Sequence, residues 1–226
     1  MNSPVDSLII LVNKIQMIKN SIYSYEYSQP KDYRFSLDSV FLAQKVAAFL
    51  KNETLNEIRV LDLCAGCGVI GLELNYHLPK LLEIDFLEVQ SVYLSHFEKN
   101  KIQAKNYEKF RFLEMNYNEL KTPLFENRYD YIVSNPPYFF PGEGLYSPNE
   151  FKNRCRFFID SDFESMVKAI IHSLKPLGSA FILMRPGGHH GRDLVFELKE
   201  LSRLMADIEI FDEVRGTLII RLIKKS

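Results

Sequence analysis

Apolar positions along the chain change their spacing near residue 58. Ahead of that point they recur every three or four residues in two stretches, which predicts one helix beginning at Ser3-Pro4 and a second over Asp38–Leu50. Residues 23–31 between them are aromatic and polar without a clear period, which predicts a loop. We therefore expect residues 1–57 to form a short helical extension that packs on the rest of the chain.

Beyond residue 58, short apolar runs alternate with helical stretches. The expected strands are Ile58–Leu63, Ile84–Glu88, Phe110–Met115, Tyr129–Ser134, Ser179–Met184, Ile208–Phe211 and Thr217–Ile223. The expected helices are Val69–His77, Gln90–Asn100, Asp162–Leu174 and Arg192–Leu204. Such alternation predicts crossover connections and a mostly parallel sheet, with an antiparallel C-terminal strand because only residues 212–216 join the last pair. Residues 58–226 are thus expected to form a single α/β domain with a doubly wound, seven-stranded sheet.

Three glycines directly follow the first of these strands. Gly66, Gly68 and Gly71 spell G-x-G-x-x-G at the start of a helix, where glycine lets the backbone turn tightly and approach a ligand. Glu88 closes the next strand, 20 residues after Gly68, at the place of a carboxylate that accepts the hydroxyls of a ribose. This Rossmann-like arrangement favours a nucleoside-containing cofactor over a tight turn without a ligand.

The residues around the turn separate two classes of cofactor. A nicotinamide dinucleotide brings a pyrophosphate to this turn, whereas S-adenosylmethionine has an ammonium and a sulfonium group and no phosphate. Asp62 ends the apolar run before the turn, so it favours S-adenosylmethionine. Cys64 and Cys67 form C-x-x-C, but no second Cys/His pair lies at ligand spacing, because Cys155 stands alone. We expect no metal site.

The most informative stretch is Asn135-Pro136-Pro137-Tyr138, at the end of an apolar strand. Proline cannot continue a central ladder, so the backbone leaves the sheet at its carboxyl edge, where α/β proteins bind ligands. The Asn135 side-chain oxygen and the Pro136 carbonyl can each accept one N–H of a planar amine or amide, and the Tyr138 ring can stack on a planar base. We therefore expect these four residues to be catalytic, by positioning an acceptor nitrogen. The alternative is a proline-rich turn with a surface tyrosine.

Three sequence blocks carry a resemblance to a known family. They are Tyr33–Asp38, Val60–Gly71, and Ser134–Phe139 followed by Gly142. From about Gln29 onward the chain resembles class I S-adenosylmethionine-dependent methyltransferases of the Asn-Pro-Pro-Tyr type, and it is most similar to bacterial tRNA N6-adenine methyltransferases that modify an anticodon-loop adenine in a valine tRNA. The resemblance implies S-adenosylmethionine as the methyl donor and the N6 amine of an adenine in RNA as the acceptor.

The motifs and the resemblance together give the expected binding residues. Those expected to bind S-adenosylmethionine are Arg34, Phe35, Ser36, Asp38, Asp62, Cys64, Gly66, Gly68, Glu88, Asn116 and Asn135. Ser36 is equally a candidate helix N-cap. Asn116 stands where similar enzymes have an acidic residue that meets the adenine of the donor, and its side-chain oxygen can still accept that hydrogen bond. Those expected to bind the acceptor are Phe139, Lys152, Arg154 and Arg156, three of them in a basic and aromatic stretch that could also be a solvated lid.

Composition narrows how RNA can be held. The chain has 28 Lys+Arg and 29 Asp+Glu, which gives a net charge of −1. This charge disfavours broad nonspecific binding of nucleic acid, so we expect RNA to be bound by a small patch near the active site. Three cysteines, no apolar run long enough to span a membrane and no charged-then-apolar leader predict a cytoplasmic protein without membrane contact. We further expect a monomer or a weak dimer.

Two other functions stay open at the level of the sequence. A protein-glutamine N5-methyltransferase acting on release factors orients an amide by the same logic. Those enzymes usually carry a sizeable helical domain ahead of the glycine turn, whereas about 57 residues precede the first strand here. The other function is that of an adaptor that binds the donor without catalysis, and the intact Asn135–Tyr138 motif argues against it.

Overall fold

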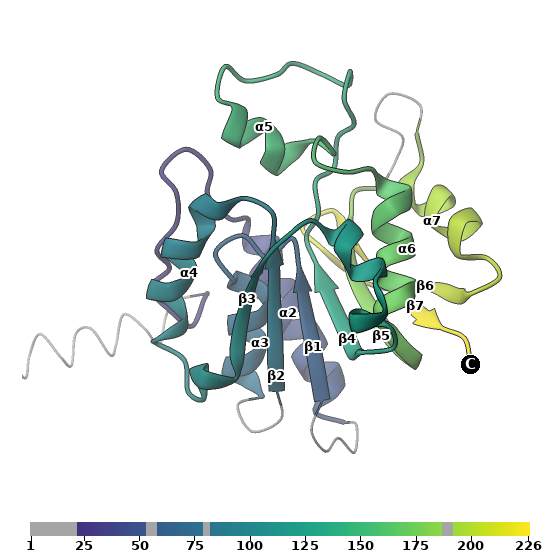
Figure 1. Ribbon diagram of the computed structural model, residues 1–226, viewed down its shortest axis with the longest axis horizontal. Coiled ribbons are helices and arrows are strands. Elements are labelled where there is room, and N and C mark those ends of the chain that lie inside the picture. Colours follow the sequence, from purple (N-terminus) through teal and green to yellow (C-terminus); the bar gives the residue numbers. More distant parts are fainter. Residues whose placement is uncertain (1–21, 53–57, 79–81, 187–191) are drawn as a thin grey trace, which may run out of the picture.

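The computed structural model describes residues 22–52, 58–78, 82–186 and 192–226. The helix expected at Ser3-Pro4 lies outside the described residues. A seven-stranded sheet forms the centre of the described part (Figure 1). Its strands are β1 (Ile58–Leu63), β2 (Leu82–Glu88), β3 (Phe110–Glu114), β4 (Tyr129–Ser134), β5 (Leu174–Met184), β6 (Ala206–Val214) and β7 (Thr217–Lys224).

The strands lie in the order β3-β2-β1-β4-β5-β7-β6. Neighbours among β1 to β5 are parallel, whereas β7 runs antiparallel between β5 and β6. The predicted Rossmann-like, mostly parallel sheet with an antiparallel C-terminal strand is confirmed. The order reverses at β1, because the chain moves outward to β2 and β3 and then returns to β4. Ligands of doubly wound sheets bind at such a switch point, beyond the carboxyl ends of the strands.

Helices cover both faces of the sheet, with α2 and α3 behind it and α6 in front of it in Figure 1. Their bounds are α2 (Leu37–Leu50), α3 (Val69–His77), α4 (Leu94–Lys101), α5 (Glu150–Arg156), α6 (Phe163–Ser173) and α7 (Leu194–Ser202). The side chains of α2, α3 and α4 share one apolar core, and those of α6 and α7 share another. Alternate strand residues serve the two cores, as Val60 packs toward α3 and Leu61 toward α6.

The glycine turn after β1 packs closely against aromatic rings. Gly68 has a φ of +85°, and a Cβ there would lie 2.8 Å from the Phe97 ring. A Cβ on Gly71 would lie 2.5 Å from the Phe86 ring. Both distances are shorter than packed atoms allow, so these two positions require glycine in order to bring α3 against β2.

The loop expected over residues 23–31 is present, and polar side chains fasten it to the helices. The Ser24 amide and hydroxyl donate to the buried Glu73 carboxylate of α3, at 2.7 and 2.8 Å. The Ser28 amide donates to Asn100 Oδ1 of α4 at 2.7 Å. This anchoring places the next residues, which lead into α2, above the glycine turn.

Candidate active site

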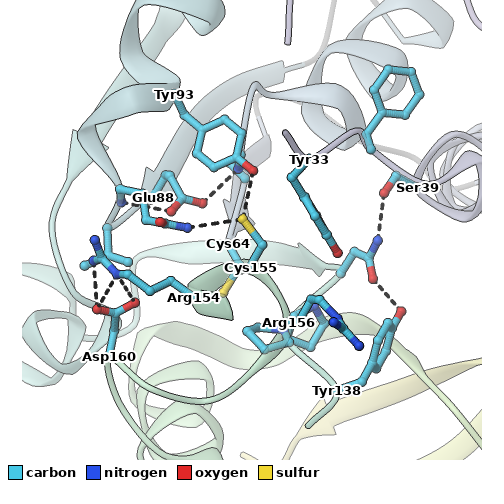
Figure 2. A pocket seen from close by; sticks show the side chains of 18 of the residues that line it. Tyr33, Ser39, Cys64, Glu88, Tyr93, Tyr138, Arg154, Cys155, Arg156 and Asp160 are labelled. Carbon is cyan, nitrogen blue, oxygen red and sulfur yellow. Dashed lines mark hydrogen bonds and ion pairs between the residues drawn. The ribbon is translucent and has the colours of Figure 1, made fainter. Parts of the chain in front are cut away.

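A cavity of about 350 Å³ opens at the carboxyl ends of β1, β2 and β4 (Figure 2). Residues 33–39, the strand ends and residues 154–161 enclose it, and Figure 1 shows α5 standing over the strand ends. The expected site residues that line it are Arg34, Phe35, Ser36, Asp38, Cys64, Gly66, Glu88, Asn116, Asn135, Pro136, Pro137, Tyr138, Phe139, Arg154 and Arg156. The structure thus brings together most of the residues singled out in the sequence. Asp62, Gly68 and Lys152 do not line the cavity.

Glu88 lies at the end of β2 and holds the glycine turn. Its Oε2 accepts from the Gly66 amide at 3.0 Å, and its Oε1 accepts from the Gln90 amide at 2.9 Å. Burial raises the pKa of Glu88 to about 6, against the effect of these two backbone donors. The carboxylate is therefore ionised at neutral pH. Because it lies on the cavity wall, it can accept further hydrogen bonds from a ligand.

Asp62 lies behind the turn, where it is fully buried. Its Oδ2 accepts from the Gly71 amide at 2.8 Å, and its Oδ1 has no hydrogen-bond partner among the described residues. Burial raises its pKa to about 7. The Asp62 side chain thus holds the start of α3. Direct contact of Asp62 with S-adenosylmethionine stays a prediction. The same is true of Gly68, which packs against Phe97.

Both ends of the Asn116 amide are already bonded. Its Oδ1 accepts from the Asn118 amide at 2.9 Å, which makes it the cap of the 3₁₀ segment Tyr117–Lys121, and its Nδ2 donates to the Asp160 carbonyl at 2.9 Å. If this oxygen also accepts a hydrogen bond from the adenine of S-adenosylmethionine, as predicted, it does so in addition to its capping bond with the Asn118 amide. Asn116 lines the cavity next to Asp160.

The Asn135 amide is held from both sides (Figure 2). Its Nδ2 donates to the Ser39 hydroxyl of α2 at 2.9 Å, and its Oδ1 accepts from the Tyr138 hydroxyl at 2.5 Å. Burial raises the pKa of Tyr138, so its hydroxyl stays a donor at neutral pH. The end of β4 is itself tied to β1, because the Ser134 hydroxyl donates to the Leu63 carbonyl at 2.8 Å. This network fixes the direction of the amide oxygen.

The residues that lead into α2 lie at the cavity, and one of them caps the helix. Ser36 is the N-cap, with its hydroxyl accepting from the Asp38 amide at 3.2 Å. Asp38 forms an ion pair at 3.4 Å with Arg215, in the turn between β6 and β7. Ser36 and Asp38 both line the cavity, so capping of the helix by this block is compatible with its predicted role in binding S-adenosylmethionine.

The stretch from Pro141 to Asp160 contains a helix that the sequence pattern did not predict, α5. Of its three cations, Arg154 is neutralised by Asp160 at 2.7 Å, and Lys152 does not line the cavity. Arg156 lies over the Phe139 ring, 5.3 Å from its centroid. The amides of Tyr138 and Phe139 donate to the Arg156 carbonyl at 3.1 and 3.0 Å, which joins α5 to the Asn-Pro-Pro-Tyr segment.

Sequence reasoning missed several lining residues. They are Gln29, Tyr33, Ser39, Tyr93, Asp160 and Arg185, among others. Tyr33 belongs to the recognised block Tyr33–Asp38 but was given no binding role, and Ser39 directly follows that block. Gln29, Tyr93 and Arg185 lie outside the three recognised blocks. The aromatic character of Tyr33 and Tyr93 is the one sequence signal that could have suggested a nucleoside-binding wall.

The cysteines of the C-x-x-C pair are free thiols, as is Cys155. Burial raises the pKa of Cys67 to about 12 and raises those of Cys64 and Cys155 as well, so all three are neutral. Cys155 Sγ lies 3.3 Å from the Tyr93 hydroxyl and 3.4 Å from Gln90 Nε2. Within the described ranges, no group of three or more His, Cys, Asp or Glu side chains is placed to hold a metal. Nor does any helix in that part of the chain have the length and apolar character needed to cross a membrane.

A family model, the methyltransferase small domain, matches residues 35–145. The match includes the entry to α2, the glycine turn, Glu88 and the Asn135–Tyr138 segment, all of which lie around the cavity. This match, which covers just under half of the chain, confirms the predicted resemblance to the class I S-adenosylmethionine-dependent methyltransferases. The predicted cofactor, S-adenosylmethionine, is confirmed at this level.

Two curated relatives of this chain act on different acceptors. It is 31% identical over 209 residues to the ribosomal protein uL3 glutamine methyltransferase of Bradyrhizobium diazoefficiens, covering 88% of this chain and 63% of the relative. It is 30% identical over 125 residues to the tRNA1(Val) (adenine(37)-N6)-methyltransferase of Dyadobacter fermentans, covering 55% of this chain and 50% of the relative. The chain therefore spans less than two thirds of both relatives.

A solved structure shares the fold of this chain. It is the 16S rRNA N2 G1207 methyltransferase of T. thermophilus in complex with AdoMet and guanosine, with a TM-score of 0.61 and 20% identity. The likeness covers 86% of this chain and 45% of that one. At this identity it establishes the fold and leaves the acceptor to be argued from the site.

Proposed function

We propose that this protein transfers the methyl group of S-adenosylmethionine to the exocyclic N6 amine of an adenine in RNA, in the anticodon loop of a tRNA. The observation that carries the proposal is the Asn135 amide, held between Ser39 and Tyr138 on the wall of the cavity. Similarity to the tRNA adenine methyltransferase of Dyadobacter fermentans supports the choice of acceptor.

The residues on the Glu88 side of the cavity fit S-adenosylmethionine. The Glu88 carboxylate would accept the hydroxyls of its ribose, and the backbone of Gly66, which has no side chain and a φ of +54°, allows close approach. The Asp38 carboxylate lines the cavity and, although Arg215 pairs with its Oδ1 at 3.4 Å, has a second oxygen that could accept from the ammonium end. When bound, the cofactor supplies an electrophilic methyl group.

The residues on the Asn135 side fit a planar exocyclic amine. The lone pair of such a nitrogen is delocalised into the ring, so the nitrogen is a poor nucleophile until its N–H bonds are oriented. Asn135 Oδ1 has a second lone pair beyond the one that Tyr138 uses, and the Pro136 carbonyl supplies another acceptor. With both N–H bonds accepted, the nitrogen forms its bond to the methyl carbon as the carbon–sulfur bond breaks, and the proton then leaves to solvent. Positioning and electrostatics carry this step.

The proposal is tested by offering labelled S-adenosylmethionine with three acceptors. They are unfractionated tRNA from a strain that lacks this protein, a release factor and ribosomal protein uL3. We expect label in the tRNA and, after digestion to nucleosides, mass spectrometry should identify N6-methyladenosine. Label in either protein and none in RNA would refute the proposal.

A glutamine side chain is the second candidate acceptor. Its amide nitrogen has the same delocalised lone pair, and Asn135 and Pro136 would orient it in the same way. The specific observation in its favour is the similarity to the uL3 glutamine methyltransferase, which extends over 88% of this chain. The three-acceptor experiment separates the two candidates directly.

Ser39 is expected to act through Asn135. Removing its hydroxyl in Ser39→Ala leaves Asn135 Nδ2 without its partner, so the amide can rotate, and we expect kcat to fall about tenfold with an unchanged KM for S-adenosylmethionine. In an Asn135→Ala background the same change should have almost no further effect. Additive losses in the double variant would show that Ser39 acts independently of Asn135.

Donor binding is expected to depend on pH through Glu88. Its pKa is raised to about 6, so the carboxylate gains a proton as pH falls below that value, loses its charge and no longer accepts through both oxygens. Affinity for S-adenosylmethionine should therefore weaken as pH falls through 6, by at most about tenfold per pH unit. Titration calorimetry between pH 5 and 8 measures this, and Glu88→Gln should abolish the change centred near pH 6 because its amide does not titrate. Any change centred near pH 7, the pKa of Asp62, should persist in that variant.

A further inference from the structure

Two arginines lie at the rim of the cavity beside the Asn-Pro-Pro-Tyr segment. Arg185 directly follows β5, and its guanidinium carbon is 5.0 Å from the centroid of the Tyr138 ring. Arg156 ends α5, with its guanidinium carbon 5.3 Å from the centroid of Phe139 and 5.5 Å from that of Phe157. Figure 2 shows Arg156 close to Tyr138. The two cations therefore flank the place proposed for the acceptor.

The two guanidinium groups converge on one region. Burial raises the pKa of Tyr33, and both Arg156 and Arg185 oppose that shift through their charge. Within the described ranges, no carboxylate lies at ion-pair distance from either arginine. Arg154 differs, because Asp160 already neutralises it at 2.7 Å. The rim thus carries two positive charges without a matching acid.

Arg185 also faces outward along the surface. It lines the main cavity and a shallow hollow beyond Tyr138, to which Phe140 and Arg192 contribute. Arg185 is exposed, and Arg156 is half-buried. Ring faces hold guanidinium groups flat, and a flat guanidinium presents two parallel N–H donors to a phosphate.

We propose that Arg156 and Arg185 bind the phosphates of the RNA strand on either side of the nucleotide whose base enters the cavity. This inference rests on the proposed function, since it requires an RNA acceptor. The whole chain carries a net charge of −1, so attraction to a polyanion has to come from a local patch of this kind. A glutamine side chain in a protein offers no phosphate for these charges.

The test compares Arg156→Gln and Arg185→Gln with Arg59→Gln in the full-length protein. Arg59 is exposed and paired with Glu83 at the opposite end of the sheet, so its substitution removes the same charge far from the cavity. With unfractionated tRNA from a strain lacking the protein, each rim variant should raise the KM for tRNA about tenfold and lower the slope of log KM against log salt by about 1. The KM for S-adenosylmethionine should stay unchanged, and Arg59→Gln should behave as the unmodified protein.

The outcomes separate this inference from the function on which it rests. Methylation of tRNA by the unmodified protein, with rim variants that keep its KM and salt slope, would overturn the phosphate contacts and leave the function standing. A raised KM for S-adenosylmethionine in either variant would assign that arginine to the carboxylate of the donor and likewise overturn the inference. Methylation of a protein and not of tRNA would overturn both.

Discussion

Replacing Asn135 with alanine should lower methyl transfer by about 10²–10³-fold while S-adenosylmethionine still binds. The estimate follows from the loss measured when one preorganised polar group that acts on the reacting atoms is removed. Here the lost group is Oδ1, whose direction is set by the Ser39 hydroxyl and the Tyr138 hydroxyl. Single-turnover rates with labelled donor measure the loss of chemistry, and calorimetry measures the binding that remains.

An asparagine elsewhere provides the control for this variant. Asn52 lies exposed just beyond the end of α2, and within the described structure its side chain donates only to the Ala48 carbonyl, so Asn52→Ala should keep full activity. Circular dichroism of both variants establishes that the fold persists. If Asn135→Ala retained more than a tenth of the activity, the acceptor nitrogen would not depend on this amide, and the proposed mechanism would fail.

The fold was predictable because its signals are local. The alternation of apolar runs with helical stretches predicts both the strands and the crossovers between them, and β1 and α3 begin and end at the predicted residues. The start of β5 was not predictable from the same pattern. Lys175-Pro176 interrupts the apolar run ahead of Ser179, yet Leu174 pairs with Tyr129 of β4 across an irregularity in the register. That pairing is a tertiary contact.

The helix α5 shows a second limit of local signals. It has seven residues and too few apolar positions for a helical period. Asn149 caps it by accepting from the Lys152 amide, and the buried Asn153 within it bonds both the amide and the carbonyl of Ser147. The helix is thus held by polar contacts to the loop before it, which composition alone does not reveal.

The site residues likewise fall into those that local sequence motifs predict and those that tertiary packing brings together. Gly66, Glu88 and Asn135 were predictable because each ends or follows a strand in a recognisable motif, and the carboxyl ends of parallel strands meet at one edge of the sheet. Ser39 and Arg185 were not, because their proximity to the Asn-Pro-Pro-Tyr segment depends on how α2 and the end of β5 pack. The sequence likewise could not reveal which cations of the basic stretch are neutralised within the fold.

Substituting Glu88 by alanine should weaken S-adenosylmethionine binding by at least about 100-fold. The carboxylate is expected to accept both ribose hydroxyls, and hydrogen bonds to a charged group contribute roughly 1.5–3 kcal/mol each. It also accepts from the Gly66 and Gln90 amides, so its loss leaves two buried donors without partners at the turn that surrounds the ligand. Calorimetry with S-adenosylmethionine measures the change, and S-adenosylhomocysteine, which has the same ribose, should lose affinity by the same factor.

Two further variants distinguish loss of the ribose contact from damage to the turn. Glu88→Gln keeps one oxygen that can accept from Gly66, so it should preserve thermal stability better than Glu88→Ala while still weakening binding. Glu83→Ala removes an exposed carboxylate from the same strand, paired with Arg59, and should leave donor affinity unchanged. If Glu88→Gln bound the donor as tightly as the unmodified protein, the ribose would not depend on this carboxylate. The donor would then have to lie in the cavity in another orientation, with its adenosine away from the end of β2.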